Sequence, residues 1–402
     1  MHSENRILMK RILSDKAFEE AKKYIPGGIS SPVRTLRLID DSPLFIDHAK
    51  GAILTDIDGN EYIDFCLSEG VFIAGHANPV VVDAVQKAIL NGTSYGIPTL
   101  LETQLAKKIT ELIPSMQQVR FVNSGTEAVI SAVRVAQGFT NREYILSFEG
   151  SCNCKSCNLL HAPFNDKEAV EKIFSEYGDR IAAVIVEPVP THMGVVPEKD
   201  GFLQYLHSIT QQYGSLLIFD EITTAFRLTL GGAQKFYGIT PDLTTVGKIV
   251  GGGFPAAAFG GRADVMKVLA PEGTVYQAGT LAGNPIAMTA GLATLTILSE
   301  RGLYNNLNLK AEKFIADLQS ILRPKGVTIS SIGNMFAPFF SPAVPTNYDE
   351  ASQSNQKAFI RFWRYMLDNG VYLSPSQFEA NFVSIQHTEE YLSDVLEIAK
   401  GY

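Results

Sequence analysis

The hydrophobic positions of this chain change period along its length, and the changes predict its elements. From residue 79 to about 290, segments with apolar residues at helical spacing alternate with short apolar runs typical of buried strands. Strand-like runs lie at 144–148, 182–186 and 216–219. Such alternation predicts an α/β fold whose central sheet is mainly parallel, covered by helices on both faces and joined by right-handed crossovers.

Less regular patterns lie on both sides of this region. We expect a helix at 16–24 and a β-hairpin at 53–65 that turns at Asp58-Gly59-Asn60. A long helix at 285–300 leads to a C-terminal α+β region, with strands at 327–332 and 335–340 and helices near 350–369 and 388–400. The expected domains are an N-terminal helix and hairpin segment (1–65), a large α/β domain (66–290) and a C-terminal α+β domain (291–402).

Composition excludes several classes of partner. The 402 residues are 46% hydrophobic, enough for a large core, and carry a net charge of −8 with no basic run, which argues against nucleic acid. No apolar run is long enough to span a membrane, and the first six residues lack the apolar core of a signal peptide. Four cysteines in so long a chain are not a disulfide framework. We therefore expect a cytoplasmic protein.

Three polar features follow predicted strands in chain order. Ser124, Gly125 and Thr126 open a helix-like run after an apolar strand, and free N–H groups there suit a phosphate. Asp220 ends the run 216–219, and Lys248 follows in a glycine-rich, apolar loop. A desolvated lysine amine is partly neutral and can form a Schiff base with an aldehyde. Phosphate site, carboxylate and amine together are what pyridoxal phosphate requires, because the carboxylate keeps its pyridine nitrogen protonated.

Each feature alone has an ordinary structural explanation. A lysine in a glycine-rich loop is usually a solvated surface residue, and an aspartate at a strand end is commonly a helix cap or turn former. The combination favours the cofactor site. Since ligands of parallel sheets lie at the carboxyl ends of the strands, Ser124, Glu187, Asp220 and Lys248 are expected to meet there.

With these motifs in view, the chain resembles the class III pyridoxal-phosphate aminotransferases, and among them the glutamate-1-semialdehyde aminomutases, nearly from end to end. The resemblance rests on the segments 27–34, 123–128, 185–189, 219–221, 247–248, 258–262, 275–285 and 374–379. Ser31-Pro32-Val33-Arg34 and Pro375-Ser376-Gln377-Phe378-Glu379 match the aminomutases in particular. It implies a fold-type I, pyridoxal-phosphate-dependent transferase.

The resemblance also implies roles for individual residues. Lys248 binds the cofactor covalently and then moves protons, Asp220 pairs with the pyridine nitrogen, and Ser124, Gly125 and Thr126 hold the phosphate. Gly279 and Thr280 reach the phosphate of the neighbouring subunit's cofactor, which implies a homodimer with shared active sites. Arg34, with Ser31 nearby, binds the substrate carboxylate, since a guanidinium matches a carboxylate bidentately. Glu379 meets the substrate's amino group.

Several positions depart from the family pattern. Cys152 and Asn153 stand where relatives have a tyrosine, which packs near the cofactor ring, and a histidine; Glu69 stands where they have a tryptophan. His192 replaces an asparagine expected near the cofactor's phenolic oxygen and is counted with the cofactor site. Between residues 158–160 and 163–166 the long segment that gates the active site in relatives is missing. We expect weaker retention of the reaction intermediate, and Glu69 adds a negative charge close to a carboxylate substrate.

The expected function is amino transfer within one small molecule, an amino-aldehyde, converting (S)-4-amino-5-oxopentanoate to 5-aminolevulinate for tetrapyrrole synthesis. The cofactor passes through its pyridoxamine phosphate form in this cycle. An ω-transaminase or a racemase that uses Lys248 is the alternative within enzymes, and a non-catalytic family member is the alternative of another class. Cys152, Cys154 and Cys157, with His161 nearby, make a weak soft-metal pattern that reads better as a drifted loop, so no metal is expected.

Overall fold

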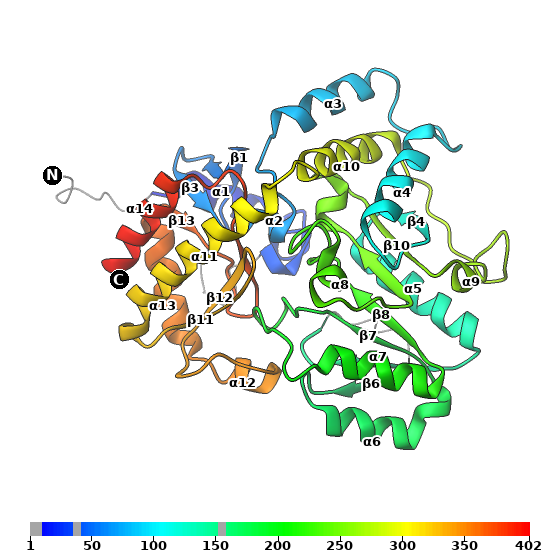
Figure 1. The fold of residues 1–402 in the computed structure, drawn as a ribbon. Coiled ribbons are helices and arrows are strands. Elements are labelled where there is room, and N and C mark those ends of the chain that lie inside the picture. Colours follow the sequence, from blue (N-terminus) through cyan, green and yellow to red (C-terminus); the bar gives the residue numbers. More distant parts are fainter. Residues whose placement is uncertain (1–9, 35–41, 152–157) are drawn as a thin grey trace.

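The computed structural model describes residues 10–34, 42–151 and 158–402. Its strands form three sheets (Figure 1). The seven-stranded sheet has the order β4-β10-β9-β8-β7-β5-β6 and contains β4 (Gln118–Val122), β5 (Tyr144–Phe148), β6 (Asn158–Ala162), β7 (Ile181–Val186), β8 (Leu216–Asp220), β9 (Leu243–Val246) and β10 (Ala257–Gly261). The two smaller sheets contain β1 (Ile46–Lys50), β2 (Ile53–Asp56), β3 (Glu61–Asp64) and β13 (Val371–Tyr372), and β11 (Thr328–Ile332), β12 (Met335–Phe339) and β14 (Asn381–Phe382).

The helices surround these sheets. They are α1 (Ile12–Ala21), α2 (Leu67–Gly70), α3 (Pro79–Ile89), α4 (Leu100–Leu112), α5 (Gly125–Thr140), α6 (Lys167–Tyr177), α7 (Phe202–Tyr213), α8 (Gly232–Tyr237), α9 (Ala263–Met266), α10 (Pro285–Leu298), α11 (Leu303–Leu322), α12 (Tyr348–Ser352), α13 (Gln356–Asp368) and α14 (Glu389–Lys400). Figure 1 shows α11, α13 and α14 with the small sheets on one side of the molecule, and the seven-stranded sheet with α5 to α8 on the other.

The prediction of a mainly parallel α/β sheet is confirmed. β5 pairs in parallel with β6 and β7, β7 with β8, and β8 with β9. β10 is the exception and runs antiparallel to both neighbours, because a short loop rather than a crossover helix joins it to β9. That loop begins at Lys248, so the candidate amine lies where the chain reverses direction.

Alternation along β8 shows how the large sheet is covered. Leu216 and Ile218 pack in the core cluster that contains the α5 residues, whereas Leu217 and Phe219 pack in the cluster of α6 and α7. Helices therefore cover both faces. Asp220 follows as the last residue of this buried strand, which directs it to the carboxyl edge.

Side-chain caps define where several helices begin. Ser124 caps α5, Asp166 caps α6, and Asn284 caps α10, each accepting a hydrogen bond from an N–H group in the first turn. Proline follows the cap in α10, as its fixed φ favours. The predicted helix at 285–300 is thus found as α10.

Two predicted element bounds were wrong. The N-terminal helix begins at Ile12 rather than at residue 16, because the Asp58 carboxylate accepts from the N–H groups of Leu13 (2.8 Å) and Ser14 (2.9 Å). The expected helix near 350–369 is two helices, since Asn355 starts a new one by accepting from the N–H of Ala358 at 3.1 Å. Both helix starts are set by hydrogen bonds to polar side chains, which the spacing of hydrophobic residues does not predict.

The hairpin at 53–65 is confirmed as β2 and β3, paired antiparallel. Strand β13, from near the C-terminus, pairs in parallel with β3 and completes this sheet. The N-terminal and C-terminal parts of the chain therefore share one sheet beside the active-site candidates. The domain boundaries at 65/66 and 290/291 stay a prediction. Within the described ranges, no helix has the length and apolar character needed to cross a membrane.

Candidate active site

A cavity of about 610 Å³ lies between the two sides of the molecule. Its wall includes Arg34, Glu69, Phe72, Thr191, Lys248 and Glu379. A second, neighbouring cavity shares Glu379 and adds His192. The predicted residues Ser124 and Asp220 are not part of either wall as described, so their relation to Lys248 rests on other contacts.

Lys248 is the first residue of a short 3-10 helix (Lys248–Gly251) immediately after Gly247. Its φ of +48° is left-handed, a conformation that costs a non-glycine residue free energy and often marks a functional position. Burial lowers the pKa of its amine, while the carboxylates of Glu69, Glu379 and Glu187 oppose that shift. The amine forms no hydrogen bond or ion pair with a described residue. It is therefore available as a nucleophile.

Asp220 is 7% exposed at the end of β8. Its Oδ1 accepts from the Thr245 hydroxyl at 3.0 Å and from the Ile222 N–H at 3.2 Å. Burial, reinforced by the charge of Glu187, raises the pKa of Asp220 to about 6. A buried carboxylate in this state gains from a cation placed beside it, and a protonated pyridine nitrogen is such a cation.

The α5 N-terminus has the form of a phosphate cradle. Ser124 and Thr126 are exposed there, and the first turn of any helix leaves N–H groups free for a ligand. The Ser124 hydroxyl accepts from the Glu127 N–H at 3.2 Å, and the Glu127 carboxylate accepts from the Asn123 N–H at 2.9 Å. This capping arrangement fixes the turn.

Ile222 connects the three cofactor candidates, and the sequence reasoning missed it. A side chain on Gly125 would lie 2.7 Å from the Ile222 Cδ1, and one on Gly247 would lie 3.2 Å from its Cγ2. Glycine at these two positions lets the α5 N-terminus and the Lys248 loop pack on Ile222 without any shift of that side chain. The phosphate cradle, the Asp220 strand and the lysine loop therefore meet at one side chain.

His192 and Glu187 form a pair that the sequence analysis did not predict. The His192 Nδ1 is 3.1 Å from Glu187 Oε1, and Glu187 also accepts from the Thr191 N–H at 3.1 Å. The Glu187 charge raises the pKa of His192 to about 9, and the His192 charge helps to hold the pKa of Glu187 below its usual range despite burial. Histidine at this position thus brings a positive charge to the cofactor side of the site.

We predict that this pair gives the protein a pH-dependent stability. The pKa of His192 is about 9 in the folded protein against an ordinary value of 6.5, so the stabilisation is complete below about pH 6.5 and is lost as pH rises through 9. The melting temperature of wild type should exceed that of His192→Asn at pH 6, and the difference should vanish near pH 10. His207→Asn, on α7, serves as the control. A difference that is constant with pH would contradict the ion pair.

Glu69 lies in a turn of unusual backbone. Leu67, Ser68, Glu69 and Gly70 all have positive φ, at 48°, 55°, 58° and 88°, so α2 is one left-handed turn. Left-handed residues other than glycine cost roughly 1–2 kcal/mol each. Other groups must hold this turn, and it aims its side chains at the cavity.

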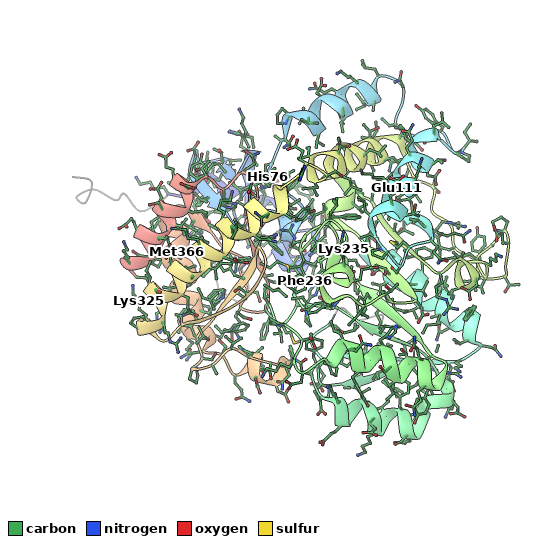
Figure 2. The ribbon with its side chains drawn as sticks, viewed as in Figure 1. His76, Glu111, Lys235, Phe236, Lys325 and Met366 are labelled. Carbon is green, nitrogen blue, oxygen red and sulfur yellow. The ribbon has the colours of Figure 1, made fainter. Side chains whose placement is uncertain are left out.

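Two buried groups hold the turn. The Asp64 Oδ1 accepts from the N–H groups of Cys66 (2.8 Å) and Leu67 (2.9 Å), and its Oδ2 is 2.7 Å from the Nε2 of His76, which Figure 2 labels near the middle of the molecule. Arg227, fully buried, donates to the Gly70 carbonyl and, at 3.2 Å, to Asn334. Burial lowers the pKa of Arg227 to about 9.

Of the three predicted substrate residues, Arg34 and Glu379 line the cavity that contains Lys248, and Ser31 does not. Arg34, in a 3-10 helix (Pro32–Arg34), lines the 610 Å³ cavity together with Lys248. Ser30, rather than Ser31, is in that wall; the Ser31 carbonyl instead accepts from the Arg34 N–H at 3.0 Å. Glu379 lies between the two cavities, and burial raises the pKa of its carboxyl.

Gly279 and Thr280 lie in a loop near the phosphate candidate of their own chain. A side chain on Gly279 would be 3.4 Å from the Asn123 amide nitrogen. Cys152, Asn153, Cys154 and Cys157 lie outside the described residues. His161 is on β6, where its Nδ1 is 3.0 Å from the Ser147 hydroxyl, and the described residues contain no cluster that could hold a metal.

Comparison with known proteins identifies the family. The model of the family described as Aminotransferase class-III matches residues 38–162 and 152–387. The chain belongs to the class III aminotransferases. Among curated relatives, a glutamate-1-semialdehyde 2,1-aminomutase 1 of Listeria monocytogenes serotype 4b is 47% identical over 413 residues, covering 96% of both chains. A glutamate-1-semialdehyde 2,1-aminomutase of Desulforapulum autotrophicum is 45% identical over 420 residues, covering 97% of this chain and 98% of the relative.

Solved class III structures share the fold. A β-phenylalanine aminotransferase from Variovorax paradoxus superposes with a TM-score of 0.91 at 31% identity, covering 97% of this chain and 93% of the other. A glutamate-1-semialdehyde aminomutase from Pseudomonas aeruginosa PAO1, in complex with PMP, has a TM-score of 0.89 at 23% identity, covering 97% and 94%. The second likeness is evidence for the fold alone.

The class III family match consists of two ranges that overlap at residues 152–162. The overlap falls where the gating segment is expected to be missing. The aligned lengths of 413 and 420 residues exceed the 402 residues of this chain, so the relatives carry residues that it lacks.

Proposed function

We propose that this protein is a pyridoxal-phosphate enzyme that converts (S)-4-amino-5-oxopentanoate to 5-aminolevulinate, a precursor of tetrapyrroles. The observation that carries the proposal is the buried, unpaired Lys248 amine in one cavity with Arg34 and Glu379. Near full-length relatives at 44–47% identity that are named glutamate-1-semialdehyde 2,1-aminomutase support the substrate. The reaction moves an amino group between neighbouring carbons of one molecule.

The residues present fit the cofactor. Lys248 would bind its aldehyde, Asp220 its pyridine nitrogen, and Ser124, Gly125 and Thr126 its phosphate, while His192 would face its phenolic oxygen. The buried Asp220 carboxylate, which lacks a described cationic partner, is the structural support for this assignment. When bound, the cofactor withdraws electrons from the substrate carbon and, in its pyridoxamine form, carries the exchanged amino group.

The chain's own residues would perform the other tasks. The Lys248 amine, partly neutral through burial, takes a proton from one substrate carbon and returns it to another position. Arg34 binds the substrate carboxylate bidentately and so orients the carbon chain. Glu379 attracts the substrate ammonium. Phe72, in the cavity wall, excludes water from one side.

A homodimer and a cytoplasmic location belong to the same proposal. Ile97, Leu100, Tyr276 and Leu281 each expose more than half of their surface. They come from the first turn of α4 with the segment before it, and from the loop of Gly279 and Thr280. These two segments lie close together, because a side chain on Gly283 would lie 2.8 Å from Glu102. Apolar side chains gathered on one surface favour burial against a second subunit. Thr280 would then reach the partner's cofactor.

The direct test is to incubate the purified, cofactor-loaded protein with glutamate-1-semialdehyde. We expect 5-aminolevulinate without any added amino donor or acceptor. An ω-transaminase, the activity named for a neighbour at 30% identity, would require a second substrate, and a racemase would invert an amino acid without moving its amino group. A non-catalytic family member would bind the cofactor and yield no product.

We predict that the active protein releases the 4,5-diaminovalerate intermediate more readily than a relative with the gating segment. We expect the gating segment of relatives to be missing from this chain, which would leave less cover over the site, and an open site raises the off-rate. Each release leaves the cofactor in its aldehyde form, so activity should decay during turnover and recover when diaminovalerate or pyridoxamine phosphate is added. Linear progress curves without free diaminovalerate would contradict this.

A further inference from the structure

Three carboxylates line the cavity that contains Lys248, and one of them, Asp64, is already hydrogen-bonded to His76 and to a backbone N–H group. Glu69 and Glu379 both line the wall beside Lys248, and neither forms an ion pair with a described cation. The other cations near them are Arg34 in the same wall and His192 in the neighbouring cavity, and His192 is paired with Glu187. If Lys248 binds the cofactor and Arg34 binds the substrate carboxylate, Glu69 has no ion-pair partner of its own among the described residues. This part of the wall therefore attracts positive charge.

Glu69 is exposed, but its backbone is held in place. Its left-handed turn is fixed by the Asp64 carboxylate at one end and by Arg227 on the Gly70 carbonyl at the other. Phe382 closes on Gly70, where any side chain would lie 2.8 Å from the ring. A costly backbone conformation supported on three sides indicates a side chain that is positioned for use.

The charge of Glu69 acts on Lys248 and Glu379, the two residues proposed to act on the substrate's amino groups and carbon atoms. Its charge is the largest influence that raises the pKa of Lys248, and it also raises the pKa of Glu379. A cation bound between Glu69 and Glu379 would relieve the repulsion that Glu69 exerts on the Glu379 carboxylate. The carboxylate partner of the substrate, Arg34, lies elsewhere in the same wall.

The chemistry of the proposed reaction needs two ammonium positions. In the substrate the free amino group is on C4, whereas after transfer through the cofactor the free amino group is on C5. With the carboxylate fixed by Arg34, these two ammonium groups occupy different places. We propose that Glu69 is a second ammonium-binding residue beside Glu379, and that it retains the diamino intermediate in a site with reduced cover. This inference rests on the proposed function for its substrate.

The test compares binding of a diamine with binding of a monoamine. Cofactor-loaded wild type and Glu69→Gln are titrated with 4,5-diaminovalerate and with 5-aminovalerate, and the absorbance change of the cofactor reports binding. Glu69→Gln should weaken diaminovalerate about threefold to fivefold, the range of a partly exposed ion pair, and should leave 5-aminovalerate unchanged. Glu61→Gln, an exposed glutamate on β3, is the matched control and should change neither.

A second variant and a second measurement separate the possible outcomes. Glu69→Asn removes the charge with a residue that tolerates left-handed backbone, so it should reproduce the result if Gln disturbs the turn. With glutamate-1-semialdehyde, both variants should release more diaminovalerate for each 5-aminolevulinate formed. Equal weakening of both ligands, or of neither, would overturn the inference. Wild type that prefers the diamine through Glu69 but makes no 5-aminolevulinate would refute the proposed function and leave the ammonium site standing.

Discussion

Borohydride reduction of the cofactor-loaded protein should place the pyridoxyl label on Lys248 alone, and Lys248→Ala should lower the rate of 5-aminolevulinate formation about 10⁴-fold. The loss combines the covalent anchor with the general base, for which 10²- to 10⁴-fold effects are usual. The amine is buried, unpaired and held at a left-handed backbone position. Peptide mapping after reduction identifies the labelled residue.

Lys235 provides the matched control for this experiment. It is exposed on α8 and labelled in Figure 2, and its replacement by alanine should change neither labelling nor rate. Addition of a small primary amine should restore part of the Lys248→Ala rate, because the amine can carry the missing proton. A label on any other lysine, or full activity in Lys248→Ala, would show that the nucleophile has been misassigned.

Asp220→Asn should have opposite effects on activity and on stability. An amide does not keep the pyridine nitrogen protonated, so the rate should fall by about 10²- to 10³-fold, the cost of one preorganised electrostatic group. The asparagine oxygen can still accept from Thr245 and Ile222. The fold should therefore be retained.

The stability of the cofactor-free protein should rise with the same substitution. The pKa of Asp220 is raised from an ordinary value of 3.8 to about 6, so its ionised form is disfavoured in the folded state. The resulting loss of stability begins above pH 3.8 and is complete above about pH 6. At pH 8 the cofactor-free Asp220→Asn should melt at a higher temperature than wild type, and the difference should shrink as the pH falls below 6 and vanish below about pH 3.8. For wild type, cofactor affinity should fall as the pH drops below 6. Near-normal turnover by Asp220→Asn would mean that another carboxylate serves the pyridine.

The sequence was sufficient for the parts of the molecule that local patterns encode. Short apolar runs and helical spacing predicted β5, β8 and α10, and the positions of Asp220 and Lys248 near strand ends follow from that pattern. The family resemblance was confirmed by the class III match. These features depend on residues near one another in the chain, where spacing and capping chemistry are visible.

Long-range contacts account for what the sequence did not reveal. Arg227 supports Gly70 across 157 positions of the chain, and Asp58 caps α1 from 45 positions away. The left-handed turn at 67–70 contains only one glycine, so nothing local marks its backbone. The pair of Glu187 and His192 lies five positions apart in a loop, where no regular spacing indicates that the side chains meet. The one local hint of this pair was that Glu187 directly follows an apolar strand and precedes Pro188.

The contact of Ile222 with both Gly125 and Gly247 makes three distant stretches of chain one mechanical unit. A displacement of Ile222 would therefore be felt both at the α5 N-terminus and in the loop that presents the lysine, although no polar contact joins these two segments through that residue. A smaller side chain at position 222 would loosen both contacts together.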